Sequence, residues 1–155
     1  MEISVVLATF NEEKNLGDCL ESVRQLADEI IVVDGGSTDK TVAIAKQYGA
    51  KIFITDNPPI FHINKQKAID LATKDWILQL DADERVNSEL SKEINATMQQ
   101  CNNVAMKQVN GYWLARKNWF LGRFLIKGGQ YPDYTLRLYK RGKGKLPCKS
   151  VHEQA

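Results

Sequence analysis

The fold is decided by residues 29–39, which read Glu29-Ile30-Ile31-Val32-Val33-Asp34-Gly35-Gly36-Ser37-Thr38-Asp39. The first six residues form a β-branched run that is typical of a strand buried on both faces, and the run ends in a carboxylate. The two glycines then predict a tight turn. Apolar residues at helical spacing follow at positions 42–45, so this part of the chain predicts a strand, a turn and a helix.

The same alternation extends along the chain in both directions. Strands are predicted at residues 3–8, 51–55 and 76–80, and helices at residues 13–26, 63–72 and 88–100. Four β-α units in a row favour a parallel sheet with helices on both faces, joined by right-handed crossovers. After residue 104 two strands, at residues 111–117 and 134–139, alternate with glycine-rich loops. The predicted fold class is α/β: a Rossmann-like, mostly parallel sheet with a smaller C-terminal β/loop portion.

Composition excludes several classes of protein and divides the chain in two. Of the 155 residues, 43% are hydrophobic and 26% are charged, which excludes disordered and collagen-like chains. No apolar run reaches the length of about 18 residues that a membrane span needs. Residues 1–105 hold 10 basic and 17 acidic side chains, a balance of −7, whereas residues 106–155 hold 11 and 2, a balance of +9. We expect residues 1–104 and 105–155 to have different tasks, with the basic part meeting an anionic partner.

The cysteines and the first residues indicate the compartment. Cys19, Cys101 and Cys148 are odd in number and widely spaced, which favours reduced thiols over a disulfide framework or a zinc site. The apolar residues 1–8 lack a basic leader and run directly into polar residues, unlike a signal peptide. A cytoplasmic location is therefore expected.

Three polar clusters follow predicted strands at the points where these strands end. They are Thr9–Glu12, Asp34–Asp39 and Asp81–Asp83. Open parallel sheets bind ligands beyond the carboxyl ends of their strands, so we expect the clusters to share one crevice. The glycines after Asp34 match neither the G-x-G-x-x-G fingerprint nor a P-loop, which argues against a dinucleotide-dependent enzyme and a P-loop NTPase.

Asp81 and Asp83 are candidate metal ligands. Residues two apart in an extended segment point the same way, so both carboxylates are expected to face one point in the crevice. Hard oxygen ligands suit Mg²⁺ or Mn²⁺, which usually bridge one or two carboxylates to substrate phosphates. The alternative is that Asp81-Ala82-Asp83-Glu84 is a solvated loop.

Together the motifs Val5–Glu13, Val32–Asp39 and Leu80–Asp83 resemble the nucleotide-binding half of family 2 glycosyltransferases, which have the GT-A fold. They occur in the family's order and at similar spacings. Within the family, the stretch from Gly111 to Glu153 looks closest to bacterial lipopolysaccharide-core glucosyltransferases. The resemblance implies an inverting transfer of a sugar from a nucleotide-sugar, such as a UDP-hexose, to a saccharide or lipid-linked acceptor.

The resemblance also assigns expected roles to individual positions. It implies a divalent ion at Asp83 and Asp81, with His152 near the ion or the diphosphate. Lys65 lies where the family often directs a basic residue toward the diphosphate, although a solvated surface lysine is the alternative. The residues expected to bind the nucleotide-sugar are Thr9, Asn11, Glu12, Asp34, Gly36, Lys65 and Asp81.

Asp133 is the candidate general base. Many family members carry the base in an acidic motif after a glycine-rich loop, and Gly128–Asp133 occupies that place. The sequence departs from the commoner pattern because Pro132 replaces an acidic neighbour. Only Asp133 and Glu153 are acidic after position 105, so Glu153 is the rival.

Aromatic and basic residues interleave at positions 112–124, a pattern compatible with nucleic acid, with a membrane surface or with packing on the sheet. We favour packing together with a role close to the acceptor or the membrane, without nucleic acid. A lipid-linked acceptor would explain the cations, and a peripheral contact with the inner membrane would accompany it.

Two other functions remain open from the sequence. A nucleotidyltransferase shares the sheet and the acidic metal ligands, but it usually has a glycine-rich, basic loop where this chain has Thr9–Glu12. A non-catalytic module would bind the sugar-nucleotide without transferring the sugar. Family 2 chains usually continue well beyond the position of Ala155, so part of the acceptor site is expected to lie outside this sequence.

Overall fold

The computed structural model describes residues 1–100 and 108–148 of the chain. Five of its strands are β1 (Ile3–Thr9), β2 (Glu29–Asp34), β3 (Lys51–Ile54), β4 (Trp76–Gln79) and β5 (Gly111–Arg116). The others are β6 (Trp119–Phe120), β7 (Arg123–Phe124) and β8 (Asp133–Lys140). The helices are α1 (Leu16–Val23), α2 (Thr41–Gln47), α3 (His62–Asp70) and α4 (Ser88–Gln100).

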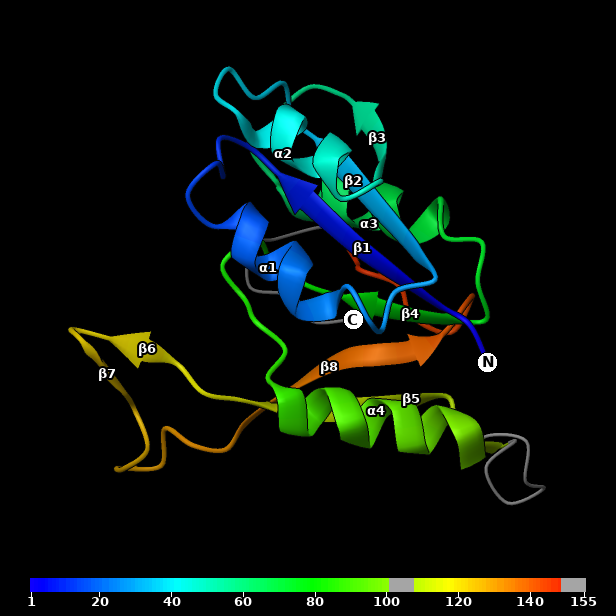
Figure 1. Ribbon diagram of the computed structural model, residues 1–155, viewed down its shortest axis with the longest axis vertical. Helices are drawn as coiled ribbons and strands as arrows, with labels where there is room; N and C mark the ends of the chain where they lie inside the picture. The colour runs from blue at the N-terminus through cyan, green and yellow to red at the C-terminus, as the bar shows by residue number, and fades with distance from the viewer. Residues whose placement is uncertain (101–107, 149–155) are drawn as a thin grey trace.

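One mixed sheet organises the molecule, with the strand order β3-β2-β1-β4-β8-β5 (Figure 1). Strands β1 to β4 pair in parallel, whereas β8 runs antiparallel to both β4 and β5. The predicted α/β class with a mostly parallel sheet is confirmed. Because β2 lies on one side of β1 and β4 on the other, the direction of winding reverses between β1 and β4, where such folds bind ligands.

The alternation of side chains along β1 divides the core between the two faces of the sheet. Val5 and Leu7 pack with α1, α2 and α4, whereas Val6 packs with α3 on the opposite face. The central strands are apolar at nearly every position because helices cover both sides. Helices on both faces are therefore confirmed.

Most differences from the predicted elements are shifts of one or two residues at their ends, and two are larger. Helix α1 is shorter than the predicted 13–26, because Asn15 and Leu16 donate to the carbonyl of Glu12 in a turn that precedes the helix. The short antiparallel pair β6–β7 was not predicted. Two-residue strands carry too few residues to show a period of two, so periodicity could not reveal them.

Glu29, at the start of β2, ties β1, β3 and the turn before β4 together. Its buried carboxylate accepts hydrogen bonds from Ser4 Oγ, from Lys51 Nζ at 2.7 Å, and from the backbone and hydroxyl of Thr73, each at 2.9 Å. Burial acts to raise the pKa of Glu29, but the hydrogen bonds from Lys51, Ser4 and Thr73 outweigh it and lower the pKa to about 2.

A Glu29→Gln variant is expected to lose about 2–3 kcal/mol of unfolding free energy at neutral pH. The folded pKa lies below the unfolded one, so this stabilisation is present above the unfolded pKa and is lost as the pH falls toward about 2. Urea unfolding should show that the difference in unfolding free energy between the variant and the unchanged chain is smaller at about pH 3 than at about pH 7. The exposed Glu2→Gln change is the control, and an equal loss in both variants would contradict the role of Glu29.

Candidate functional site

The carboxyl ends of β1, β2 and β4 lie at the same edge of the sheet, as the sequence predicted. Register pairs Thr9 at the end of β1 with Asp34 at the end of β2. The loop after β4 begins on the other side of β1, where Leu80 N donates to the carbonyl of Val6. The candidate site is built from these three strand ends and from the start of the antiparallel strand β8.

Asp34 is the centre of a buried hydrogen-bond cluster. Its Oδ2 accepts from Thr9 Oγ1 at 2.9 Å and from Ser37 Oγ at 2.6 Å, and its Oδ1 accepts from the backbone N of Gly36 and Ser37 at 3.1 and 2.7 Å. Gly36 has a φ of +82°, which favours glycine and lets the chain fold back over the carboxylate. An ionised carboxylate accepts about four hydrogen bonds, so these partners occupy most of the capacity of Asp34.

The loop after β1 is joined to the loop after β2 through side chains. Asn11 N donates to Ser37 Oγ at 2.8 Å, and Asn11 Oδ1 accepts from Thr38 N at 2.9 Å. Glu12 N donates to Thr41 Oγ1 at 2.7 Å. The structure therefore brings three of the predicted nucleotide-binding residues to Asp34, namely Thr9, Gly36 and, through Ser37, Asn11, whereas Glu12 is joined to Thr41 of α2.

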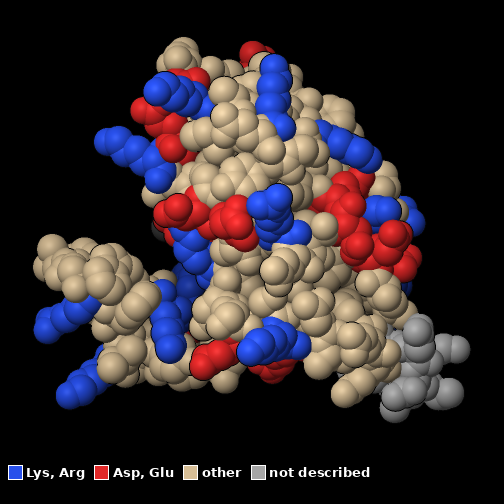
Figure 2. All heavy atoms as spheres, in the orientation of Figure 1, with Lys and Arg blue, Asp and Glu red and all other residues tan. Residues whose placement is uncertain are grey.

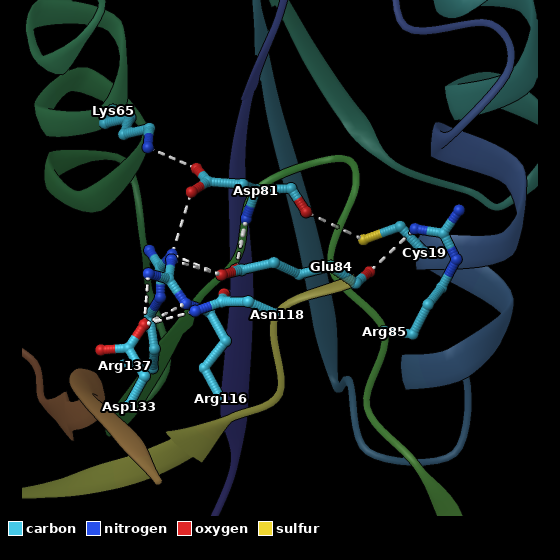
Figure 3. Close-up of polar contacts among 9 residues, drawn as sticks. All are labelled: Cys19, Lys65, Asp81, Glu84, Arg85, Arg116, Asn118, Asp133 and Arg137. Atoms are coloured by element: carbon cyan, nitrogen blue, oxygen red, sulfur yellow. Dashed lines mark hydrogen bonds and ion pairs between the residues drawn. The ribbon is translucent and has the colours of Figure 1, made fainter. Parts of the chain in front are cut away.

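Asp81 is held between two cations (Figure 3). Its Oδ1 pairs with Lys65 Nζ from α3, and its Oδ2 accepts from Arg137 Nη2 of β8 at 2.9 Å. Burial acts to raise the pKa of Asp81, but Arg137 and Lys65 outweigh it and hold the pKa below the usual range. The side chain of Lys65 is only 12% exposed, so the alternative of a solvated surface lysine is wrong.

Arg137 continues the network from Asp81 toward Glu84 and the start of β8, and the sequence reasoning did not single it out. Its Nη2 also donates to Glu84 Oε1 at 2.6 Å, and Arg116 Nη1 lies 3.6 Å from the same oxygen. Within the described part of the chain, the buried Nε of Arg137 has no hydrogen-bond partner. The sequence signal that could have revealed Arg137 is a basic residue between Leu136 and Leu138 in a predicted strand, where the structure buries it.

Asp133, the first residue of β8, lies at the far end of this network. Its Oδ2 accepts from Asn118 Nδ2 at 3.0 Å and from Arg116 Nη2 and Nε at 2.7 and 3.1 Å. The hydrogen bonds from Asn118 and then Arg116 hold the pKa of Asp133 below its usual range. Oδ1 accepts no hydrogen bond from the described residues, so one oxygen of this carboxylate can receive an incoming hydroxyl.

The segment that follows β4 turns rather than continuing as a strand. Glu84 N donates to Asp81 O at 3.0 Å, and Asp81 N donates to Glu84 Oε2 at 2.9 Å. The expectation of an extended Asp81–Asp83 segment is therefore wrong, because this reciprocal pair closes a turn in which Ala82 is buried and Asp83 is exposed. Residues two apart on a turn do not share a direction as they do on a strand.

The carboxylates fit a divalent ion only where a substrate supplies further ligands. Among residues 1–100 and 108–148, no group of three His, Cys, Asp or Glu side chains could hold a metal. Both oxygens of Asp81 pair with cations. Asp83 is exposed, and its carboxylate offers the hard oxygen ligands that Mg²⁺ and Mn²⁺ prefer. Mg²⁺ and Mn²⁺ commonly use one or two carboxylates together with substrate phosphates, which agrees with this donor set. His152 and Glu153 lie outside the described residues.

Cys19 supports the loop after β4 from the side of α1. Its Sγ donates to Asp81 O at 3.5 Å, and burial raises the pKa of the thiol to about 12. A thiol with this pKa is protonated and unreactive at neutral pH. Cys148 Sγ donates to the carbonyls of Leu146 and His62 at 3.3 and 3.4 Å, and Cys101 lies outside the described residues.

A doubly wound sheet with a polar site at its switch point defines the class of open α/β proteins that bind ligands beyond the carboxyl ends of their strands. The chain belongs to glycosyltransferase family 2, since the model of that family, Glycosyl transferase family 2, matches residues 4–154. The resemblance stated from the sequence motifs is confirmed.

Similar proteins agree with this family and with the fold. The lipopolysaccharide core biosynthesis glycosyltransferase LpsC of Rhizobium meliloti is 31% identical over 99% of this chain and 56% of its own length. An uncharacterized glycosyltransferase of Rickettsia felis is 43% identical over 60% of this chain and 32% of its own. The chain thus spans between a third and somewhat over half of the length of these relatives.

Solved structures show the same fold at low sequence identity. S. aureus TarS 1-349 superposes with a TM-score of 0.61 at 24% identity, over 82% of this chain and 39% of that one. M. tuberculosis glucosyl-3-phosphoglycerate synthase superposes with a TM-score of 0.55 at 22% identity, over 71% of this chain and 43% of that one. The GT-A type of fold is therefore confirmed.

Proposed function

We propose that this chain is the donor-binding and catalytic part of an inverting hexosyltransferase that uses a UDP-sugar. The observation that carries the proposal is the continuous polar network at the switch point, from Lys65 and Asp81 through Arg137 and Glu84 to Asp133. A structure of TarS in complex with UDP, and one of glucosyl-3-phosphoglycerate synthase with Mn²⁺ and UDP-glucose, support the choice of donor. The name of LpsC supports an acceptor of the lipopolysaccharide-core type.

In this proposal residues 1–104 bind the donor and residues 105–155 face the acceptor. The cluster around Asp34 would contact the uracil and ribose, with Asn11 and Glu12 beside it. Lys65 would neutralise charge on the diphosphate, a task for which its position beside Asp81 at the switch point is suitable. His152 is proposed to approach the same diphosphate.

The proposed reaction is a single displacement at the anomeric carbon. Asp133 accepts the proton of the acceptor hydroxyl through Oδ1 as the hydroxyl oxygen forms the new glycosidic bond. The bond from the anomeric carbon to the diphosphate oxygen breaks, UDP leaves, and the configuration inverts. A Mg²⁺ or Mn²⁺ ion, held at Asp83 with Asp81 nearby, would supply neutralising charge to the departing diphosphate.

A comparison of donors tests this function directly. UDP-glucose and UDP-galactose with Mn²⁺ should raise the melting temperature, by on the order of 5 °C at about 100 times Kd, whereas GDP-, CMP- and dTDP-sugars should not. Release of UDP in the presence of a lipopolysaccharide-core acceptor would establish transfer. Pyrophosphate release from UTP and a sugar phosphate would instead indicate a nucleotidyltransferase, and binding without transfer would indicate a non-catalytic module.

The metal ligand can be tested separately from activity. In an Asp83→Ala variant, Mn²⁺ should no longer increase the melting temperature of the protein with UDP, because the exposed carboxylate in the donor set is gone. Glu89→Ala, which removes an equally exposed acid from the start of α4, is the matched control. An unchanged Mn²⁺ effect in Asp83→Ala would exclude Asp83 as a ligand.

A further inference from the structure

The β6–β7 hairpin extends away from the sheet as a separate arm (Figure 1). Trp119 pairs with Phe124 and Phe120 pairs with Arg123, and the two residues Leu121 and Gly122 join the strands. The rings of Trp119 and Phe124 meet edge to face at 4.7 Å. Leu125 N donates to Asn118 O at 2.8 Å and closes the base of the hairpin.

The arm carries large apolar side chains that face solvent. Leu121 at the tip is 84% exposed and Trp119 is 61% exposed, and the other exposed members are Phe120, Phe124 and Ile126. Five such residues within eight positions exceed the scattered apolar residues of an ordinary surface. The edge contact between Trp119 and Phe124 leaves most of this surface in water, so the arm is suited to an external partner.

Besides its exposed apolar surface, the tip of the hairpin has a strained backbone. Leu121 has a φ of +48° and Gly122 has a φ of +78°, so both central residues of the turn are in the left-handed region. Asparagine, aspartate or glycine adopts such a turn with little strain, whereas a leucine does not. A leucine that is both strained and exposed does not stabilise the described chain, but its burial in an apolar partner would contribute favourable free energy.

The charges of the arm identify the chemistry of this partner. The cations Lys117, Arg123 and Lys127 flank the apolar residues, and residues 108–132 contain no Asp or Glu. In Figure 2 the arm projects as a tan mass with blue side chains beside it and no red ones on it. A partner complementary to the arm therefore has an apolar interior for the exposed side chains and an anionic outer layer for the flanking cations.

We propose that the β6–β7 hairpin docks the protein onto an anionic phospholipid bilayer. Leu121 at the tip and the neighbouring aromatic side chains enter the boundary between head groups and acyl chains, and the cations remain at the level of the phosphates. Among the described residues no helix is long and apolar enough to cross a membrane. A projecting tip suits a fluid bilayer, which needs no matching groove.

The base of the hairpin adjoins the acceptor side of the candidate site. Asn118, the residue before β6, donates to Asp133 Oδ2 at 3.0 Å. Docking would therefore bring Asp133 close to the head-group level. This link to a lipid-linked acceptor rests on the proposed function, whereas the docking itself does not.

Sedimentation with sonicated vesicles tests the proposal without donor or acceptor. The 155-residue chain should bind vesicles containing phosphatidylglycerol and should bind pure phosphatidylcholine vesicles far less. Replacing Trp119 and Phe120 by serine should lower the partition coefficient by about tenfold or more, and Arg123→Gln should lower it by about fivefold. The emission of Trp119 should shift to shorter wavelength on binding, and this shift should be absent in Trp119→Phe.

Ile54→Ser is the matched control, because Ile54 is an equally exposed apolar residue on β3 at the opposite edge of the sheet. This variant should bind vesicles as the unchanged chain does. Circular dichroism of every variant ensures that the fold is intact. Unchanged vesicle binding by the hairpin variants would overturn the proposal. A dimer that forms without lipid and that the hairpin substitutions abolish would also overturn it. Loss of transfer with vesicle binding retained would count against the proposed function alone.

Discussion

An Asp133→Asn variant is expected to lose transfer activity while retaining its affinity for the donor. A general base contributes about 10²–10⁴-fold to the rate, so kcat should fall by that factor and the UDP-dependent increase in melting temperature should remain. The amide can still accept hydrogen bonds from Asn118 and Arg116, so the surroundings of β8 should change little. Initial rates of UDP release, together with thermal shifts, measure the two effects.

The pH dependence of activity adds a readout that a structural role would not affect. Because Asn118 and Arg116 hold the pKa of Asp133 below its usual range, the base stays deprotonated and the acid limb of kcat/KM should lie below the pH typical of aspartate. Arg116→Gln removes one cause and should move this limb to higher pH.

Asp75→Asn is the control for the role of Asp133, since Asp75 is an exposed acid at the amino end of β4. It should leave kcat unchanged. Full activity in Asp133→Asn, with loss of activity in Glu153→Gln, would identify Glu153 rather than Asp133 as the general base.

An Arg137→Met variant is expected to lose about 3–5 kcal/mol of unfolding free energy near neutral pH, because Asp81 and Glu84 would lose a cation they share in a largely buried site. The side chain of Arg137 is 10% exposed, so water screens this interaction far less than it screens a surface pair. Urea unfolding monitored by circular dichroism measures the loss.

Acid should reduce the difference between Arg137→Met and the unchanged chain. Arg137 and Lys65 hold the pKa of Asp81 below its unfolded value, so the stabilisation is present above that value and disappears as the pH falls through the folded pKa. Adding Glu84→Gln to the variant should restore part of the lost stability, because one uncompensated carboxylate is removed.

The matched control for Arg137 is Arg24→Met. Arg24 pairs with Glu21 three residues away, and both side chains are mostly exposed. Such surface pairs contribute about 0–1 kcal/mol, so this variant should unfold close to the unchanged chain. A comparable loss in the two variants would show that the network around Arg137 has no special importance for stability.

The sequence predicted the fold well because the helices and central strands have local signatures. Glu29–Asp34 was predicted with its observed bounds, since a buried parallel strand is apolar at nearly every position. The β6–β7 pair was missed because its strands are too short for a periodic signal and its turn holds Leu121 where a hairpin turn usually holds asparagine or glycine.

The candidate site was predicted in part. Thr9 and Asp34 meet as expected, because neighbouring parallel strands end at one edge and their register pairs these two residues. Arg137 was missed because its partners Asp81 and Glu84 are 56 and 53 positions away along the chain. No local pattern reveals that β8 returns antiparallel beside β4.

By itself the sequence determined the α/β class, the family and the edge of the sheet that carries the polar residues. The class and the edge follow from local burial patterns that repeat with the period of a strand or a helix. The family follows from the resemblance of three motifs, Val5–Glu13, Val32–Asp39 and Leu80–Asp83. Only the tertiary structure decided the partners of Asp81, the turn that separates it from Asp83, and the exposure of the hairpin. Ion pairs and exposure depend on which distant segments become neighbours and in which register, and this is a property of the packed chain as a whole.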